Sequence, residues 1–453
     1  MGFGKGSAHY YHLITEKKDK FVTVNSRPVV ILLFSLIITG APNLSANTVD
    51  EINPLAALPM RHIGPALMSG RISDFAFYPS GNQAFIAGIS SGNIFRTFNG
   101  GTTWEPIFEN EDSYAIGVVE LDPNDTNTIW VGTGENNAQR SVAAGSGVYK
   151  SVDGGKSWSN VGLEDSGHIS QIWINPNDSA EVIVASQGPL WSDCGDRGLF
   201  RPSDGGKTWE LILEIDEHTG VNEFVVDPRD PDVIVASTYQ RRRHVWVLIN
   251  GGPGSGIHKT TDRGQSWTEV KAGLPSNQMG RIGLAGAPSD PNMLYAIIEA
   301  SDEEKGVYRS TNFGETWEKR SSYMTTSPQY YNEIVVDPIN SDRIYALNTF
   351  TMKSEDGGST FAPLTTQWRH VDDHALWIDP DNTQHLYIGG DGGIYESWDR
   401  GNTWRHLRNL SITQFYRIQP DYVEPFYNVC GGCLLYTSPS PRDRQKSRMP
   451  WSA

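Results

Sequence analysis

The sequence predicts an all-β fold, and three observations lead to that prediction. Glycine, tryptophan and tyrosine are abundant, at 46, 14 and 18 of 453 residues. An eight-residue phrase of the form "SVDGGKSW" (151–158) occurs in seven copies along the chain. Long amphipathic patterns that would indicate helices are missing from the sequence. Many short strands joined by glycine-rich turns account for all three observations.

The repeat predicts how these strands are arranged. A strand-like run that ends in a proline turn keeps the same spacing as the octapeptide, as in "IWINPND" (172–178). Each unit of roughly 50 residues reads as four short strands. Such units are the blades of a β-propeller, because a single blade cannot bury both faces and must stack on its neighbours around a ring. We therefore predict a propeller of four-stranded blades, with seven units between residues 58 and 410.

The octapeptide itself predicts a structural role. Its carboxylate can accept hydrogen bonds from the backbone of its own tight turn, and the glycine at its fifth position tolerates a positive φ. The closing tryptophan is expected to anchor the turn in the apolar layer of the blade. The phrase resembles the Asp box of sialidases and of bacterial neuraminidase repeats. The aspartates concerned are Asp153, Asp204, Asp262, Asp356 and Asp399.

The two ends of the chain are set apart from the ring. Residues 1–46 read as an upstream extension and a signal peptide, since Arg27 precedes an apolar run too short to span a bilayer; a buried strand and an uncleaved anchor are the alternatives. We expect export to the periplasm, cell surface or extracellular space, with no membrane span in the mature chain. Residues 411–432 read as the start of a further blade, of a larger ring or of a second propeller. Residues 433–453 are basic and Ser/Pro-rich, and we treat them as a non-native tail.

Charge and composition exclude one class of partner. The formal net charge is −16, and no basic patch runs through the main body of the sequence. Phosphate binding needs a basic footprint, so nucleic acid is not expected as a partner. A peptide, a protein or a carbohydrate remains as the expected ligand.

Candidate ligand contacts come from columns of the aligned units. The strand that enters each unit carries polar residues at the mouth of the ring, where an apolar lining would otherwise be expected. Loops after the second strand add carboxylates and amides, as in "GTGENN" (132–137). The alternative is that these groups hydrogen-bond to one another or to channel water. The predicted contacts are Arg71, Glu135, Asn136, His168, Glu223, Arg281 and His374.

Three carboxylates are candidates for catalysis, and one segment is a candidate for a cation. Glu135, Asp372 and Asp373 could each supply one member of a carboxylate pair. The segment "HVDDHALWIDP" (370–380) could hold a hard cation such as Ca²⁺, although strand alternation keeps its four polar side chains from converging. We predict no resident metal or cofactor, with calcium as the alternative. The run Arg241–Arg243 is either an anion site or a solvated charge run.

Longer phrases resemble a known family. "MRHIGPALMSGRISDFAFYPSG" (60–81), "GGPGSGIHKTTDRGQSW" (251–267) and "HALWIDPDNTQHLYIGGDGGIYESWDRGNTW" (374–404) are similar to large exported bacterial proteins. These are described as sortilin-like, or as glycosyl hydrolases with neuraminidase repeats. The resemblance spans roughly Leu58 to Gly432 and implies a propeller, with a poorly defined biochemical role. It also implies that the family's proteins are longer than this chain.

Two enzyme relatives imply catalytic motifs that this sequence lacks. Sialidases carry an Arg-Ile-Pro phrase near the start, and here "GRISDF" (70–75) has Ser73 at the proline position. Xyloglucanases carry a catalytic Asp in the first blade, and here "ISSGNIFR" (89–96) has none. We therefore expect an exported propeller that binds a peptide, protein or glycan on its loop-rich face. The alternative is a glycoside hydrolase of xyloglucanase or sialidase type.

Overall fold

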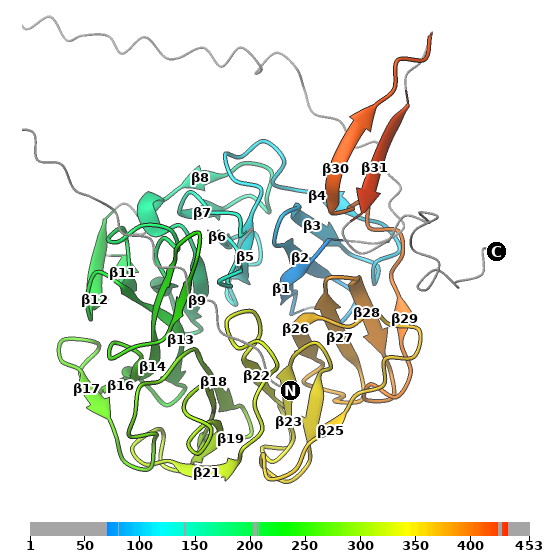
Figure 1. Cartoon of the computed structure of the whole chain (residues 1–453). Helices are drawn as coiled ribbons and strands as arrows, with labels where there is room; N and C mark the ends of the chain where they lie inside the picture. Colours follow the sequence, from blue (N-terminus) through cyan, green and yellow to red (C-terminus); the bar gives the residue numbers. More distant parts are fainter. Residues whose placement is uncertain are drawn as a thin grey trace, which may run out of the picture. The chain divides into compact units, whose positions relative to one another are not determined.

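The protein is an all-β propeller, as the repeat predicts (Figure 1). The computed structural model describes residues 70–433, with gaps at 80, 140–141, 203–205, 207 and 425–427. Within this part, seven blades follow one another around a ring, with one short 3-10 helix, η1 (Glu164–Ser166). The predicted signal peptide at 1–46 lies outside the described residues, and so does the predicted tail at 433–453 apart from its first residue, Cys433.

The first three blades each contain four strands. Their bounds are β1 (Ile72–Phe77), β2 (Phe85–Ile89), β3 (Asn93–Thr97), β4 (Glu105–Pro106), β5 (Ile116–Leu121), β6 (Ile129–Thr133), β7 (Val148–Ser151), β8 (Ser159–Asn160), β9 (Ile169–Asn175), β10 (Asp178–Ser186), β11 (Gly198–Pro202) and β12 (Trp209–Leu213). Neighbouring strands within a blade are antiparallel.

The fourth blade has an extra strand, because β14 is unusually long and pairs with a short strand near its end. The strands of blades four to six are β13 (Thr219–Asp227), β14 (Asp230–Arg243), β15 (Leu248–Asn250), β16 (Gly256–Thr260), β17 (Thr268–Val270), β18 (Ile282–Ala287), β19 (Asp290–Ile298), β20 (Gly306–Ser310), β21 (Glu318–Ser321), β22 (Glu333–Val336), β23 (Ile344–Leu347), β24 (Met352–Ser354) and β25 (Ala362–Pro363).

The seventh blade closes the ring, and a separate hairpin follows it. These strands are β26 (Asp373–Ile378), β27 (Leu386–Gly390), β28 (Gly393–Ser397), β29 (Arg405–His406), β30 (Phe415–Pro420) and β31 (Val429–Cys433). Strands β30 and β31 pair with each other in a two-stranded sheet. The division of the chain at residues 58, 410 and 432 stays a prediction.

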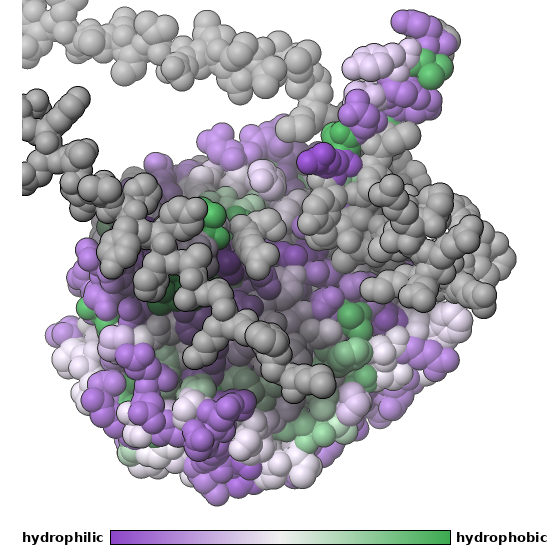
Figure 2. All heavy atoms as spheres, in the orientation of Figure 1, coloured by the Kyte–Doolittle hydropathy of each residue, from purple (hydrophilic) through white to green (hydrophobic). Residues whose placement is uncertain are grey.

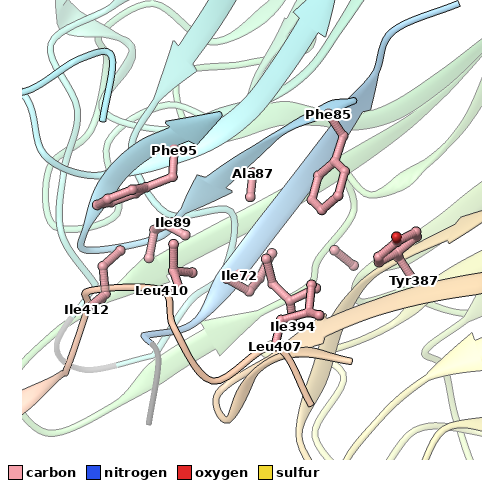
Figure 3. Packing of buried hydrophobic residues seen from close by; sticks show 11 residues of the cluster. Ile72, Phe85, Ala87, Ile89, Phe95, Tyr387, Ile394, Leu407, Leu410 and Ile412 are labelled. Atoms are coloured by element: carbon pink, nitrogen blue, oxygen red, sulfur yellow. The ribbon is translucent and has the colours of Figure 1, made fainter. Parts of the chain in front are cut away.

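The hydrophobic core lies between blades, because each blade presents apolar residues to both of its neighbours. Figure 3 shows the contact that closes the ring, where Ile72, Phe85 and Ala87 of the first blade meet Tyr387 and Ile394 of the seventh. Similar clusters fill the other blade interfaces. Closure leaves no terminal blade with an open apolar face, which is the reason that propellers form rings.

The octapeptide turns have the hydrogen bonds that the sequence predicts for them. Asp153 accepts from the backbone N–H of Lys156 at 3.0 Å and of Ser157 at 2.9 Å. Gly155 has a φ of 79°, in the left-handed region that glycine tolerates. The same acceptor pattern occurs at Asp262, Asp356 and Asp399. Asp204 lies in a gap of the described residues.

The tryptophans of these turns also join neighbouring blades, which the sequence did not predict. The indole N–H of Trp158 donates to the carbonyl of Ile107 in the preceding blade at 2.6 Å. Trp209 and Trp267 repeat this bond to Val161 and Ile212. The octapeptides therefore brace the ring with polar as well as apolar contacts.

Candidate functional site

One face of the ring collects two kinds of loop. The loops that enter the first strand of each blade, and those that join its second strand to its third, lie on the same side, and the octapeptides lie on the other. The predicted ligand-contact residues come from this loop-bearing face. We call the group Arg71, Glu135, Asn136, His168, Arg281, His374 and Asp391 the hub.

Arg71 forms two ion pairs in the hub, with Glu135 and with Asp391. Arg71 Nη1 donates to Glu135 Oε2 at 2.7 Å, and Arg71 Nε donates to Asp391 Oδ1 at 2.7 Å. Glu135 is buried and also accepts from the Ser91 hydroxyl at 2.8 Å. One guanidinium therefore links two carboxylates from the second and seventh blades.

His374 and Tyr330 complete the surroundings of Asp391. Tyr330 donates its hydroxyl to Asp391 at 3.1 Å, and His374 Nε2 lies 3.3 Å from the same carboxylate. Burial alone would raise the pKa of Asp391, but His374 and Arg71 outweigh it and hold this pKa below its ordinary value. Asp391 is thus an ionised, fully partnered group.

A loop of the second blade crosses the axis of the ring. Arg243 donates to the carbonyl of Ala138 at 2.7 Å, and Arg241 donates to that of Asn137 at 2.9 Å. On the opposite side, the N–H of Ala138 donates to the carbonyl of Gln329 at 2.9 Å. Residues 134–139 therefore span from the fourth blade to the sixth. Arg241 and Arg243 are buried and hold this loop by hydrogen bonds to its carbonyl groups. They are therefore not a solvated charge run.

Asn136 and Arg281 meet beneath this loop. The Asn136 side chain accepts from Gln187 at 2.5 Å and from Arg281 at 3.4 Å. Arg281 also donates to Asn222 at 3.2 Å and to Glu333 at 3.3 Å. The structure thus brings these two predicted residues together in one hydrogen-bond network.

His168 serves the same loop. Its Nδ1 lies 2.8 Å from the backbone carbonyl of Glu135. Burial, and then the charge of Arg241, lower the pKa of His168 well below its ordinary value. A neutral imidazole that donates from Nδ1 fits this contact.

Glu223 belongs to a second set of carboxylates, which hydrogen-bond to the innermost strand of the next blade. Glu223 accepts from the N–H of Leu284 in the next blade, as Asp74 does from Val119 at 3.0 Å. Burial raises the pKa of Glu223 to about 8 and that of Asp74 to about 7. Glu120, near Asp74, has its pKa raised to about 8, by burial and then by the charge of Asp74. Burial thus holds the pKa of all three carboxyls above its ordinary value.

The two aspartates of the "HVDDH" segment differ in their surroundings. Asp373 is buried between the Arg369 guanidinium and the Thr351 hydroxyl, which donates at 2.6 Å. Asp372 is half-buried and accepts from the Tyr331 hydroxyl. No contact among the described residues joins Glu135 to either aspartate, so the structure does not assemble a carboxylate pair from these candidates.

No group of three or more His, Cys, Asp or Glu side chains that could hold a metal ion occurs in the described part of the chain. His370 turns its Nδ1 to the carbonyl of Val371, and His374 faces Asp391, so the segment diverges as strand alternation predicts. Calcium binding stays a prediction.

The rim of the same face is open, in contrast to the hub. Large side chains on its loops are exposed, including Tyr114, Trp191, Trp246, Phe350 and Trp368. Figure 2 shows hydrophobic residues scattered among hydrophilic ones over the visible face of the described ring. Exposed aromatics on rigidly held loops are suited to ligand stacking.

Sequence reasoning missed Asp391, Tyr330 and Gln187 as members of the hub network. Asp391 lies in the "GGDGG" turn (389–393) between β27 and β28, the turn type that supplied other hub groups. Its place in a turn between the second and third strands of a blade could have identified Asp391 as a hub residue. Tyr330 and Gln187 carry no mark in the sequence that separates them from core residues.

Known proteins of two kinds, sortilin-type proteins and xyloglucanases, are similar to this propeller. Residues 197–348 match the Sortilin-Vps10 family model, described as "Sortilin, neurotensin receptor 3". The xyloglucanase Xgh74A of Acetivibrio thermocellus is 26% identical over 284 residues, which cover 55% of this chain and 32% of that protein. Sortilin of Rattus norvegicus is 21% identical over 269 residues, covering 56% of this chain and 30% of that protein.

Solved structures agree on the fold. The GH74 xyloglucanase from Xanthomonas campestris has a TM-score of 0.59 at 16% identity, covering 81% of this chain and 58% of that one. An enzyme from Niastella koreensis, also GH74, has a TM-score of 0.57 at 18% identity, covering 81% and 59%. The chain spans about a third of the curated relatives it matches. No helix in the described part is long and apolar enough to cross a membrane.

Proposed function

We propose that this chain is an exported propeller that binds a peptide, protein or glycan ligand on its loop-bearing face, without hydrolysis by Glu135, Asp372 or Asp373. One observation carries the proposal: Glu135 and Asp373 are each paired with an arginine inside the ring, and the rim aromatics of the same face are exposed. Retaining and inverting glycosidases need two carboxyl groups that face each other across the bond to be cut. Glu135 and Asp373 are instead held by Arg71 and Arg369.

The likeness to xyloglucanases favours a second candidate, a glycoside hydrolase that acts on a polysaccharide. One assay distinguishes a binding propeller from a glycoside hydrolase. The protein is incubated with xyloglucan and other soluble polysaccharides, and reducing-end release is measured next to binding. We expect binding without release. Release that is lost in both E135Q and D373N would overturn the proposal in favour of the hydrolase.

Export and calcium are separate parts of the proposal. The apolar run before residue 46 supports export, and its test is the mature N-terminus of protein recovered from culture fractions. The acidic balance of the chain supports calcium as the ion to test. A higher Tm with Ca²⁺ that is reversed by EDTA would establish calcium binding, and an unchanged Tm would remove it.

A further inference from the structure

Backbone hydrogen bonds join two loops on the rim of the sixth and seventh blades. The N–H of Asp372 donates to the carbonyl of Thr349 at 3.0 Å, and that of Leu364 donates to Thr351 at 2.9 Å. Residues 348–351 and 364–373 therefore form one unit. Phe350 projects from the first loop with half of its side chain exposed, and Trp368 projects from the second.

Trp368 is held in an unfavourable backbone conformation. Its φ is 65°, which a bulky residue rarely adopts, and its side chain is 82% exposed. Its neighbour Arg369 is buried against Asp373 and lies over the Trp404 ring, 5.1 Å from the ring centre, which fixes the loop. Burial of Trp368 cannot compensate for the strain. Strain that persists at an exposed aromatic is typical of ligand-binding loops.

Asp372 supplies a free acceptor in the same unit. Its φ is 71°, a second strained position four residues from Trp368. The Tyr331 hydroxyl donates to Oδ1, and Oδ2 has no hydrogen-bond partner among the described residues. The Thr349 hydroxyl lies 3.1 Å from the Tyr331 hydroxyl. A carboxylate oxygen and the Thr349 hydroxyl thus lie on the same pair of loops as two exposed aromatic rings, and Tyr331 contacts them from the loop that enters the sixth blade.

We propose that Trp368, Phe350, Asp372, Tyr331 and Thr349 form a carbohydrate-binding platform on the rim of the sixth and seventh blades. We call this group the rim platform. The inference rests on the proposed function and narrows it to one ligand class and one place. A pyranose ring stacks its C–H face on an exposed indole, and its hydroxyls donate to Asp372 Oδ2.

The chemistry of the rim platform favours a sugar over a peptide. Trp368 presents an open surface, whereas peptide side chains are recognised in pockets that bury them. A sugar matches a flat aromatic surface next to a hydrogen-bond acceptor, and it brings no charge. The net charge of −16 also disfavours acidic peptides.

The test measures binding of xyloglucan oligosaccharides and cellohexaose to the 453-residue protein by calorimetry. We expect W368A to weaken binding of at least one of these sugars by about tenfold or more, and D372N by a smaller factor. W246A is the matched control, because Trp246 is also 82% exposed on a loop of this face, but on the fourth blade. It should bind like the wild type.

The outcomes separate this inference from the proposed function. If W246A loses sugar binding while W368A retains it, the face binds ligand and the rim platform is wrong. If the wild type binds no sugar of the set, the carbohydrate inference is wrong, and binding of a peptide library to the same protein then tests the proposed function alone. Near-ultraviolet circular dichroism of each variant confirms that the fold is retained.

Discussion

The hub and the rim platform lie on the same face of the propeller and differ in how their polar groups are used. In the hub, Arg71 pairs with both Glu135 and Asp391, and the loop at residues 134–139 crosses the axis. On the rim platform, Asp372 keeps a free oxygen, and Trp368 is exposed in a strained conformation. The charged residues at the mouth of this ring thus pair with one another, whereas Asp372 and Trp368 at its edge leave a carboxylate oxygen and an aromatic ring open to a ligand.

The largest effect should come from removing the hub's central cation. R71A leaves Glu135 and Asp391 buried without their shared partner, which should cost about 3–5 kcal/mol in the free energy of unfolding. W368A should change it by less than about 0.5 kcal/mol. Urea denaturation measures both. Equal effects of the two substitutions would remove the distinction between hub and rim platform.

A second contrast compares tryptophans on the two faces. Trp267 packs into a blade interface and donates its indole N–H to Ile212 at 2.6 Å, whereas Trp246 is exposed. We expect W267A to destabilise the protein by about 2–3 kcal/mol and W246A by less than about 0.5 kcal/mol. Thermal unfolding ranks the two variants. A W246A variant as unstable as W267A would show that the rim aromatics are structural as well.

A third prediction concerns the carboxyls below the hub. Glu120 has a folded-state pKa of about 8, well above its ordinary value, because of burial and then of Asp74. The unfolded chain therefore ionises first, and stability falls as the pH rises from about 4 to about 8. E120Q should raise the unfolding free energy by about 1 kcal/mol at pH 9 and leave it unchanged at pH 4. The same gain at both pH values would assign the effect to packing.

The smallest expected change in stability comes from W368G, which tests whether the backbone strain at Trp368 serves ligand binding. Glycine adopts the φ of Trp368 without a steric penalty, so W368G should raise stability by about 0.5 kcal/mol while sugar binding is lost. Opposite changes in stability and binding are the signature of strain kept for function. A W368G protein that is less stable than the wild type would show that the side chain supports the loop.

The repeat made the fold predictable from the sequence, because octapeptide and proline turn recur with every blade. The same alignment located Arg71, His168, Arg281 and His374 at the ring mouth. It could not reveal that they bind one another, since this depends on residues 134–139 crossing the axis to Gln329. Trp368 was equally hidden, because a positive φ and an exposed ring leave no mark in the sequence.

Hydrogen exchange of backbone amides, with and without xyloglucan oligosaccharide, tests the central claim most directly. The contrast between a sealed hub and an open rim platform predicts that the sugar slows exchange in residues 348–351 and 364–372. Residues 134–139 of the hub loop should exchange at the same rate in both samples. Protection of the hub loop with no change at 364–372 would contradict the account.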